Sequence, residues 1–147
     1  MQIQPTPADD KVLLMDYSMP SQVVMFGDLA VSVEDAIADR PDLAFSTNLC
    51  LEELITNTIQ YGLGNAPDHT IRVRISRTRD FLEIEVQDDA PYFDPFNAAP
   101  LPDVGASVED RQIGGLGVHL VRSLMDDVLA SYDGTGNRIT LKKTLKQ

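Results

Sequence analysis

Two stretches near the middle of the chain alternate between apolar and polar residues. Residues 71–76 have the sequence Ile-Arg-Val-Arg-Ile-Ser, and residues 82–87 have the sequence Leu-Glu-Ile-Glu-Val-Gln. Because successive side chains of a strand point to opposite faces, this period of two predicts a pair of strands with one buried face. The link Arg77–Asp80 is short enough for a hairpin. The charge pairs expected between the strands are Arg72 and Arg74 with Glu83 and Glu85.

Three other stretches place their apolar residues at helical spacing. The first begins near Ser21, a suitable capping residue, and runs to Asp39, and Pro41 is expected to end it. The second runs from about Leu43 to Tyr61 and stops at a segment rich in glycine. The third covers about Leu116–Asp127.

The remaining segments complete the expected fold. Val12–Met15 is a short apolar run that can form a strand, and Val128–Tyr132 and Arg138–Thr144 form a final pair of strands joined by the turn 133–137. Residues 94–113 contain three prolines and no period, which is typical of a functional or disordered loop. This order predicts an α+β protein, a two-layer sandwich with helices on one face of a mixed, mostly antiparallel sheet.

Composition limits where the protein works and what it binds. The 147 residues fit one domain, 1–147, with a loose tail over residues 1–10, and a hydrophobic fraction of 43% indicates a globular chain. The net charge of −11 argues against direct binding to nucleic acid. No apolar run approaches the ~20 residues that span a bilayer. The N-terminus lacks a basic segment followed by an apolar one, so we expect no signal peptide, and Cys50 is the only cysteine. We therefore expect a cytoplasmic protein that does not bind a membrane.

The charge is uneven along the chain. Residues 1–70 hold 11 acidic and 2 basic residues, a net charge of −9, whereas residues 71–147 hold 12 acidic and 10 basic residues, a net charge of −2. An acidic N-terminal half can steer a basic partner towards the protein, or it can simply be a solvated surface.

A polar stripe marks the second predicted helix. Glu53 and Asn57 are four residues apart, and Tyr61 follows one turn later. Residues four apart stack on one side of a helix, so the three side chains are expected to lie together. An amide oxygen can ligate Mg²⁺ while a neighbouring carboxylate accepts a proton from a hydroxyl group or water. The alternative is a solvated helix face with no chemical role.

Asp88 stands at the end of the second predicted strand. It shares the parity of the apolar residues at 82, 84 and 86, so the pattern points its carboxylate towards the core, whereas Asp89 points outwards. A carboxylate that points inwards needs a hydrogen-bond donor, and the exocyclic amine of a purine is a suitable one. In the alternative interpretation the strand ends at residue 87, and Asp88 only caps the loop that follows.

Glycines gather ahead of the third predicted helix, in Gly114-Gly115-Leu116-Gly117. The segment lacks the lysine of a P-loop and does not follow a strand, as a dinucleotide-binding fingerprint would. It precedes a helix, so its backbone N–H groups and the positive helix end could hold phosphate, unless it is only a flexible hinge. Arg111, just before it, could reach a terminal phosphate or could be merely solvated.

Taken in order, these segments resemble the sequence boxes of the GHKL ATPase superfamily (the HATPase_c-like domains). More narrowly, they are similar to the bacterial anti-sigma-factor serine/threonine kinases. The first box is similar to Leu51–Gly62, the second to Asp88–Pro95 and the third to Gly115–Asp126. The resemblance covers roughly residues 10–145. Each box is short, but the three in this order are specific.

The resemblance implies a role for most of these residues. Glu53 would be the general base, Asn57 would hold Mg²⁺, and Asp88 would accept the adenine amine. Residues 94–117 would form a flexible ATP lid on a Bergerat-type sandwich. The ATP-binding residues that it implies are Asn57, Tyr61, Asp88, Ala90, Phe93, Arg111, Gly114, Gly115, Leu116, Gly117 and Val118.

Two residues depart from the family pattern. Ala90 stands where the second box usually has glycine, so a Cβ atom must fit close to the adenine. Tyr61 stands where the first box often has a histidine before glycine, which changes how the phosphates are lined. Neither change removes a catalytic atom, but Ala90 bears on the affinity for nucleotide.

The function implied is that of an ATP- and Mg²⁺-dependent protein serine/threonine kinase. Its substrate would be an anti-anti-sigma (STAS) protein, the same surface would alternately hold a sigma factor, and the chain would form a homodimer. A second hypothesis is a non-catalytic binding module that sequesters its partner and uses nucleotide only as a switch. A histidine kinase domain is less favoured, because neither His69 nor His119 lies in a dimerisation helix ahead of the ATP domain.

Overall fold

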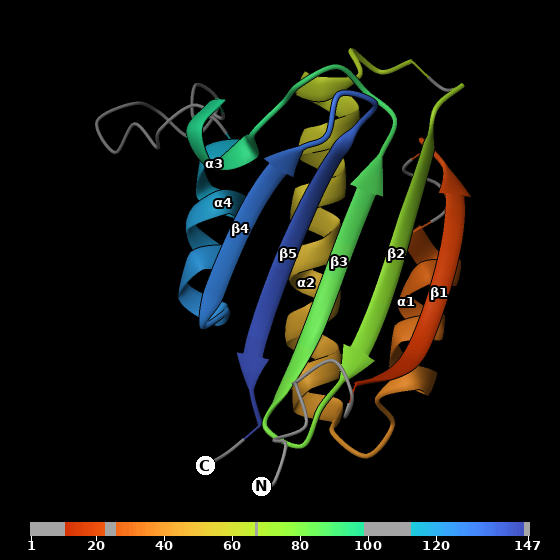
Figure 1. Cartoon of the computed structure of the whole chain (residues 1–147), viewed down its shortest axis with the longest axis vertical. Helices are drawn as coiled ribbons and strands as arrows, with labels where there is room; N and C mark the ends of the chain where they lie inside the picture. Colours follow the sequence, from red (N-terminus) through yellow and green to blue (C-terminus); the bar gives the residue numbers. More distant parts are fainter. Residues whose placement is uncertain (1–10, 23–25, 67, 99–112, 146–147) are drawn as a thin grey trace, which may run out of the picture.

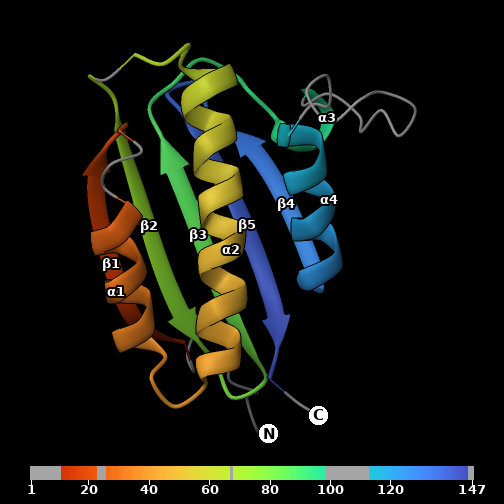
Figure 2. The same ribbon diagram turned by 180° about the vertical axis from the view of Figure 1, so that it is seen from behind.

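A sheet forms one layer of the molecule and the main helices form the other (Figure 1). The computed structural model of the chain describes residues 11–22, 26–66, 68–98 and 113–145. In chain order the elements are β1 (Val12–Pro20), α1 (Phe26–Ala36), α2 (Pro41–Asn57), η3 (Thr58–Gly62), β2 (Thr70–Arg77), β3 (Phe81–Asp88), α3 (Pro95–Ala98), α4 (Ile113–Leu124), β4 (Asp127–Tyr132) and β5 (Asn137–Thr144). Seen from behind, α1, α2 and α4 all cover the same face of the sheet (Figure 2).

The strands lie in the order β1-β2-β3-β5-β4. The α+β sandwich expected from the sequence is confirmed. Every pairing between the described strands is antiparallel, so this part of the sheet is not mixed. The reason is that β4 and β5 form a hairpin whose second strand pairs with β3. β4 therefore runs parallel to β3 but is separated from it by β5.

The two central strands follow the alternation predicted for them. Ile71, Val73 and Ile75 of β2 are fully buried, as are Leu82 and Ile84 of β3. Their neighbours along each strand face away from the helices, where solvent reaches one side of the sheet. The alternation of apolar and polar residues therefore predicted correctly which face of the sheet the helices cover.

The predicted charge pairs between β2 and β3 are correct for one pair of the two. Arg74 donates to the Glu85 carboxylate at 2.6 Å. Arg72 instead forms a bidentate pair with Asp16 of β1, at 2.6 and 2.8 Å. The reason is that β1 lies on the other side of β2 and offers a carboxylate there, while Glu83 is opposite Ser76 and not opposite an arginine.

The first strand and the first helix differ from the sequence prediction. β1 is longer than the predicted Val12–Met15, because it pairs with β2 along its whole length and ends at Pro20. Consequently Ser21 does not cap a helix, and α1 begins at Phe26. The Ser21 side chain is buried, and its hydroxyl donates to the carbonyl of Ala66 at 2.7 Å.

Pro41 begins a helix and does not end one. α1 already ends at Ala36, and Pro41 is at the start of α2, with Arg40 as the preceding cap residue. Proline is well suited to the first turn of a helix, because its missing N–H group would have no partner there. The same residue type is therefore compatible with both a helix end and a helix start.

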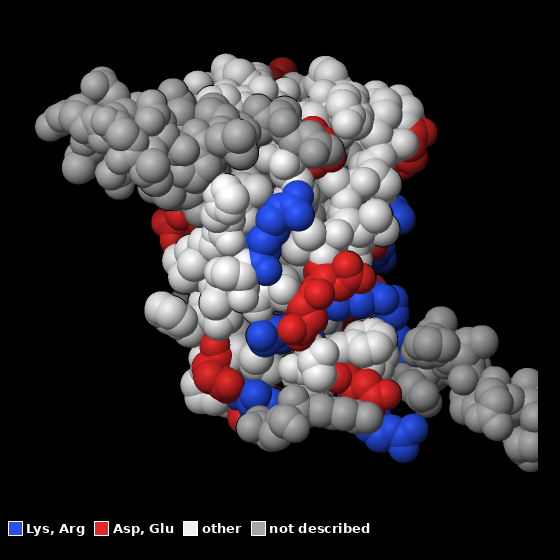
Figure 3. All heavy atoms as spheres, turned by 90° about the vertical axis from the view of Figure 1, so that its left-hand side faces the viewer, with Lys and Arg blue, Asp and Glu red and all other residues white. Residues whose placement is uncertain are grey.

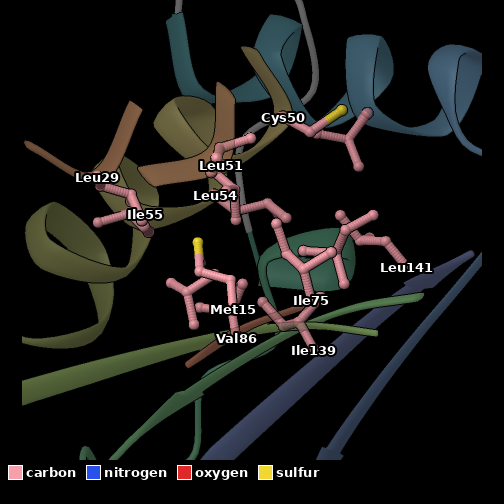
Figure 4. Packing of buried hydrophobic residues seen from close by; sticks show 14 of the residues in the cluster. Met15, Leu29, Cys50, Leu51, Leu54, Ile55, Ile75, Val86, Ile139 and Leu141 are labelled. Carbon is pink, nitrogen blue, oxygen red and sulfur yellow. The ribbon is translucent and has the colours of Figure 1, made fainter. Parts of the chain in front are cut away.

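The hydrophobic core lies between α2 and the sheet (Figure 4). Leu51, Leu54 and Ile55 of α2 meet side chains that rise from the strands, and each is at most 1% exposed. The labelled strand residues on the other side are Met15, Ile75, Val86, Ile139 and Leu141. Cys50 is also fully buried, and burial raises the pKa of its thiol to about 11.

Figure 3 shows the side of the molecule that carries α4 and β4. In its lower part, acidic and basic side chains lie next to one another.

Two exposed tyrosines meet at the end of β4, where the rings of Tyr92 and Tyr132 are edge to face at 5.8 Å. None of the helices in the described part of the chain combines the length and apolar composition that a bilayer-spanning segment needs.

Candidate functional site

The candidate site lies where α2 and β3 end and the β4–β5 turn returns (Figure 1). Two close contacts join its parts. Glu53 of α2 packs against Gly117 of α4, and Phe93, in the loop after β3, packs against Gly62 of η3. Residues from all three predicted boxes therefore come together at one end of the molecule.

Glu53 is half-buried and lies against the backbone of α4. A Cβ atom added to Gly117 would overlap Oε2 of Glu53 and would lie 2.8 Å from its Cδ. Gly117 is itself buried, so it cannot easily move away. Because Gly117 has no Cβ atom, the Glu53 carboxylate lies directly against the backbone of α4, and a larger residue would force this side chain to turn aside.

The environment of Glu53 changes its acidity. Burial raises the pKa of the Glu53 carboxyl group above its ordinary value, and the nearby negative charge of Glu52 raises it further. A carboxylate with a raised pKa holds a proton more readily, which is what a general base requires.

Asn57 is the last residue of α2 and is only 1% exposed. The chain then continues as the π-helical turn η3, in which the N–H of Leu63 bonds to the carbonyl of Thr58 at 2.8 Å. Tyr61 lies in this turn and is exposed to solvent, and its place beside Asn57 stays a prediction. Glu53 and Asn57 lie one turn apart on α2, as their spacing predicted.

Asp88 is half-buried at the end of β3, and it holds the following loop through one oxygen. Its Oδ1 accepts the N–H of Ala90 at 2.9 Å. The same oxygen accepts the backbone N–H of Asn137 at 3.2 Å and the side-chain Nδ2 at 2.9 Å. β3 includes Asp88, so the strand does not end at residue 87 as the loop-capping interpretation assumed, but Oδ1 does cap the loop. Among the described residues, every hydrogen bond of the Asp88 side chain is made by Oδ1, so a ligand amine would have to meet Oδ2.

Asn137 connects the same loop at three points, and the sequence analysis assigned it no role beyond the turn. Its side chain is buried at the start of β5. Besides Asp88, its Nδ2 donates to the carbonyl of Pro91 at 2.9 Å, and its Oδ1 accepts the N–H of Phe93 at 2.9 Å. Asn137 therefore fixes the shape of the loop from Asp88 to Phe93.

The residue before Asn137 also has to be small. A Cβ atom at Gly136 would overlap the carbonyl oxygen of Asp88 and would lie 3.1 Å from Cα of Asp89. Since these are backbone atoms, they cannot turn aside as a flexible side chain could. The β4–β5 turn therefore lies directly against the end of β3.

Ala90 fits its place without strain. It is 2% exposed, and its N–H is used by Asp88. Among the described residues other than glycine, Asn65 alone has a positive φ, so Ala90 has a backbone conformation open to any L-amino acid. The loss of the usual glycine is therefore compatible with this loop.

Asp89 points outwards, as the strand parity predicted, and it is tied to a second loop. It is exposed, and its Oδ1 lies 2.9 Å from Nδ1 of His69. The backbone of His69 is in turn bonded to Ser21 at the end of β1. The loop between η3 and β2 is therefore anchored beside the loop that Asp88 caps.

The glycine segment lies inside a helix and not ahead of it. α4 begins at Ile113, three residues before the predicted start, and ends at Leu124, so Gly114, Gly115 and Leu116 belong to its first turn. The cause is that α4 packs against α2, and this contact outweighs the low helix propensity of glycine. Val118 is buried in the following turn.

The expected lid, residues 94–117, is described only at its two ends. At the first end the short helix α3 carries Phe96, whose ring lies 4.9 Å below the guanidinium of Arg122 on α4. Arg111 lies outside the described residues. The position of the first end of the lid is therefore set by α4.

The groups at this end of the molecule suit a purine nucleotide and a divalent cation. Oδ2 of Asp88 is an acceptor for an amine, and the amide of the buried Asn57 is of a kind that ligates Mg²⁺. The first turn of α4 has backbone N–H groups that no intrahelical carbonyl accepts, as every helix start does.

Comparison with known proteins gives this arrangement a family. A model described as "Histidine kinase-like ATPase domain" matches residues 19–143. The serine-protein kinase RsbW of Listeria monocytogenes is 33% identical over 132 residues, which cover 84% of this chain and 81% of that protein. The serine/threonine-protein kinase BtrW of Bordetella bronchiseptica is 27% identical, and the match covers 72% of this chain and 75% of BtrW. The anti-sigma F factor of Clostridium novyi is 27% identical over 90% of this chain and 93% of its own.

A solved structure supports the fold. The histidine kinase domain of the Erythrobacter litoralis EL346 blue-light activated histidine kinase superposes with a TM-score of 0.52 at 16% identity. The superposition covers 86% of this chain and 62% of that one, and at this identity it concerns the fold alone. The family model spans most of the chain, and the relatives are named as a serine-protein kinase, a serine/threonine-protein kinase and an anti-sigma F factor. The chain therefore belongs to the histidine kinase-like ATPase domain family, as a domain of the anti-sigma-factor kinase type.

Proposed function

We propose that this chain is an ATP- and Mg²⁺-dependent protein serine/threonine kinase. It transfers the γ-phosphate to a serine or threonine of an anti-anti-sigma (STAS) partner and regulates a sigma factor by partner switching. One observation carries the proposal: the half-buried Glu53 carboxylate has a raised pKa and lies one turn before Asn57, against the start of α4. The relatives named as serine-protein kinases and as an anti-sigma factor support the same class of reaction and partner.

The site residues have two kinds of role: some bind the nucleotide and the metal, and Glu53 takes part in the reaction. Asp88 accepts the base amine at one end, and Glu53 accepts the proton of the substrate hydroxyl group at the other. The hydroxyl oxygen bonds to the γ-phosphorus, the bond from that phosphorus to the β,γ-bridging oxygen breaks, and ADP leaves. Asn57 holds the metal through its amide oxygen. When bound, Mg-ATP supplies the phosphoryl group and the metal neutralises its charge. The chain then contributes mainly position, because the contact of α2 with α4 sets the Glu53 end and the hydrogen bonds of Asn137 set the Asp88 end.

The test is transfer of labelled γ-phosphate to purified STAS-domain proteins of the source organism. Glu53→Gln is expected to lower the rate by about a hundredfold or more, the usual contribution of a general base. Asp35→Asn is the matched control, because Asp35 is an exposed carboxyl group on α1, which contributes no residue to the candidate site. The nucleotide-dependent rise in melting temperature should persist in both variants. Undiminished transfer by Glu53→Gln would remove Glu53 as the base.

A second readout separates the kinase from the binding module. If the native chain forms no phosphoprotein, yet binds a STAS protein or sigma factor differently with ATP and with ADP, the non-catalytic module is the correct function. Mass spectrometry of the partner after incubation detects the phosphate directly. Size exclusion with light scattering measures the homodimer that the proposal includes.

A further inference from the structure

A groove runs between α1 and α2 on the helix layer, in the half of α2 that precedes the candidate site. Its larger hollow has a volume of about 570 Å³ and is lined by three alanines, Pro41 and Phe45, with Glu34 and Asn48 as its polar members. A smaller hollow of about 50 Å³ shares Ala30 and Asn48 with it and continues the groove along both helices. Figure 2 shows the two helices on this face of the molecule.

The groove is apolar and its walls are fixed. Phe45 is 69% exposed, although it is a large apolar side chain, and it stands on the wall of the groove. Asn48 of α2 donates to the carbonyl of Ala30 on α1 at 3.2 Å, which holds the two helices together. The small alanines leave room for another helix to approach closely, since the distance between packed helices depends on the side chains at the contact.

The charge around the groove is acidic and uncompensated. Residues 26–57 contain seven acidic residues and a single base, Arg40, which is already paired with Asp42 at 3.1 Å. Four of the acids are exposed and form no ion pair with any described residue: Asp28, Glu34, Asp35 and Glu52. This negative surface favours a partner with positive charge.

The open face of the sheet lacks this imbalance, because its charges pair with one another. Glu85 meets Arg74 at 2.6 Å and Arg138 at 3.6 Å, and Glu83 meets Lys11 at 2.7 Å. A second copy of the chain, with its net charge of −11, would bring the same acidic residues against the groove. Like charges therefore oppose self-association at this surface.

We propose that the groove between α1 and α2 binds a basic amphipathic helix of another protein. An apolar residue of that helix enters the hollow beside Phe45, and its lysine or arginine residues face the acidic rim at Glu34. The groove is distinct from the candidate active site, because residues 45 and 57 are about 18 Å apart along α2 at 1.5 Å per residue. The inference does not depend on phosphotransfer.

The test uses two synthetic peptides of about 18 residues, both with leucine at helical spacing. One has lysine on its polar face and the other has glutamate, and binding to the full chain is measured by fluorescence anisotropy. We expect the lysine peptide to bind and the glutamate peptide to bind at least about tenfold more weakly. Phe45→Ser should weaken the lysine peptide by about tenfold, as loss of an interface anchor does.

Two further variants make the result specific to the groove. Glu34→Gln should weaken the lysine peptide and reduce its dependence on salt. Val31→Ser is the matched control, because Val31 is 55% exposed on α1 but does not line the groove, and it should leave binding unchanged. Equal binding by Phe45→Ser and the native chain would overturn the proposal. So would a native dimer that Phe45→Ser converts to a monomer, because a second copy would then occupy the groove.

Discussion

The two ends of the candidate site are held in different ways. At the Asp88 end, hydrogen bonds connect the β3 loop to Asn137 on β5 and fix both main chain and side chains. At the Glu53 end, the carboxylate is placed by contact with Gly117, and burial makes its charge less favourable. A hydrogen-bonded end should control stability and affinity, whereas a desolvated end should control rate and pH dependence. Such a division suits a site that holds its nucleotide in a fixed position at one end and reacts through a single charged group at the other.

The largest effect expected at the hydrogen-bonded end is that of Asp88→Asn. An asparagine can keep the three bonds to Oδ1 with its amide oxygen, but it places a donor where Oδ2 would accept an amine. Stabilisation by ATP should therefore disappear. For the native chain it amounts to about 2.7 kcal/mol at a hundredfold excess over Kd. Thermal shift with Mg-ATP, Mg-ADP and GTP measures it.

Asp89→Asn is the control for this change, because Asp89 is exposed and bonds to His69 instead. It should leave the ATP response intact. A full ATP shift in Asp88→Asn would show that the nucleotide base is not recognised at this carboxylate.

A smaller effect is expected from Asn137→Ala. The change removes a buried side chain and leaves the N–H of Phe93 and one bond of Asp88 without their partner. The free energy of unfolding should fall by about 1–3 kcal/mol, and nucleotide should bind more weakly because the loop is no longer fixed. Urea unfolding gives the first quantity, and calorimetric titration of ATP gives the second.

Asn48→Ala provides a comparison on the helix layer, where the asparagine makes one described hydrogen bond, to Ala30. It should change stability less and should leave the affinity for ATP unaltered. If Asn137→Ala bound ATP as tightly as the native chain, the loop would not need its hydrogen bonds to form the site.

The smallest effect is expected for Glu53→Gln at the desolvated end, and this change should raise the stability of the fold where the others lower stability or affinity. The folded-state pKa of Glu53 is raised, so the folded state loses stability as pH rises above the ordinary value of 4.5. Glu53→Gln cannot ionise and should therefore melt at a slightly higher temperature than the native chain at pH 7. The difference should vanish below about pH 4, where the carboxyl group is protonated in both states. A lower melting temperature at pH 7 would mean that the charged carboxylate stabilises the fold.

The strands at the centre of the sheet could be predicted because their side chains obey a local rule. Residues 71–76 and 82–87 alternate, and alternation alone identifies the buried face. The start of α1 and the role of Pro41 could not be predicted in this way. A serine suits a helix cap or a loop anchor equally well, and a proline suits a helix start or a helix end. The pairing of β1 with β2 as far as Pro20 decided the role of Ser21, and that contact is not local.

In the candidate site, too, features set by local sequence could be predicted, whereas those set by distant contacts could not. The short motifs around Glu53, Asp88 and Gly117 marked the segments that the fold brings together. The partner of Asp88 was missed because Asn137 is 49 residues away in the sequence and sits in a segment with ordinary turn composition. The π-helical turn that follows α2 was missed because bonding between residues five apart has no simple hydrophobic period.

The burial of Cys50 makes the chain convenient for labelling with thiol reagents. Its pKa of about 11 keeps the thiol protonated at neutral pH, whereas it is the thiolate that attacks an alkylating reagent. Since it is the only cysteine of the sequence, the native protein already behaves as a cysteine-free background. A fluorophore attached through Phe45→Cys would report on the groove, and one attached through Tyr92→Cys would report on the loop beside Asp88. Both reporters need only a single substitution.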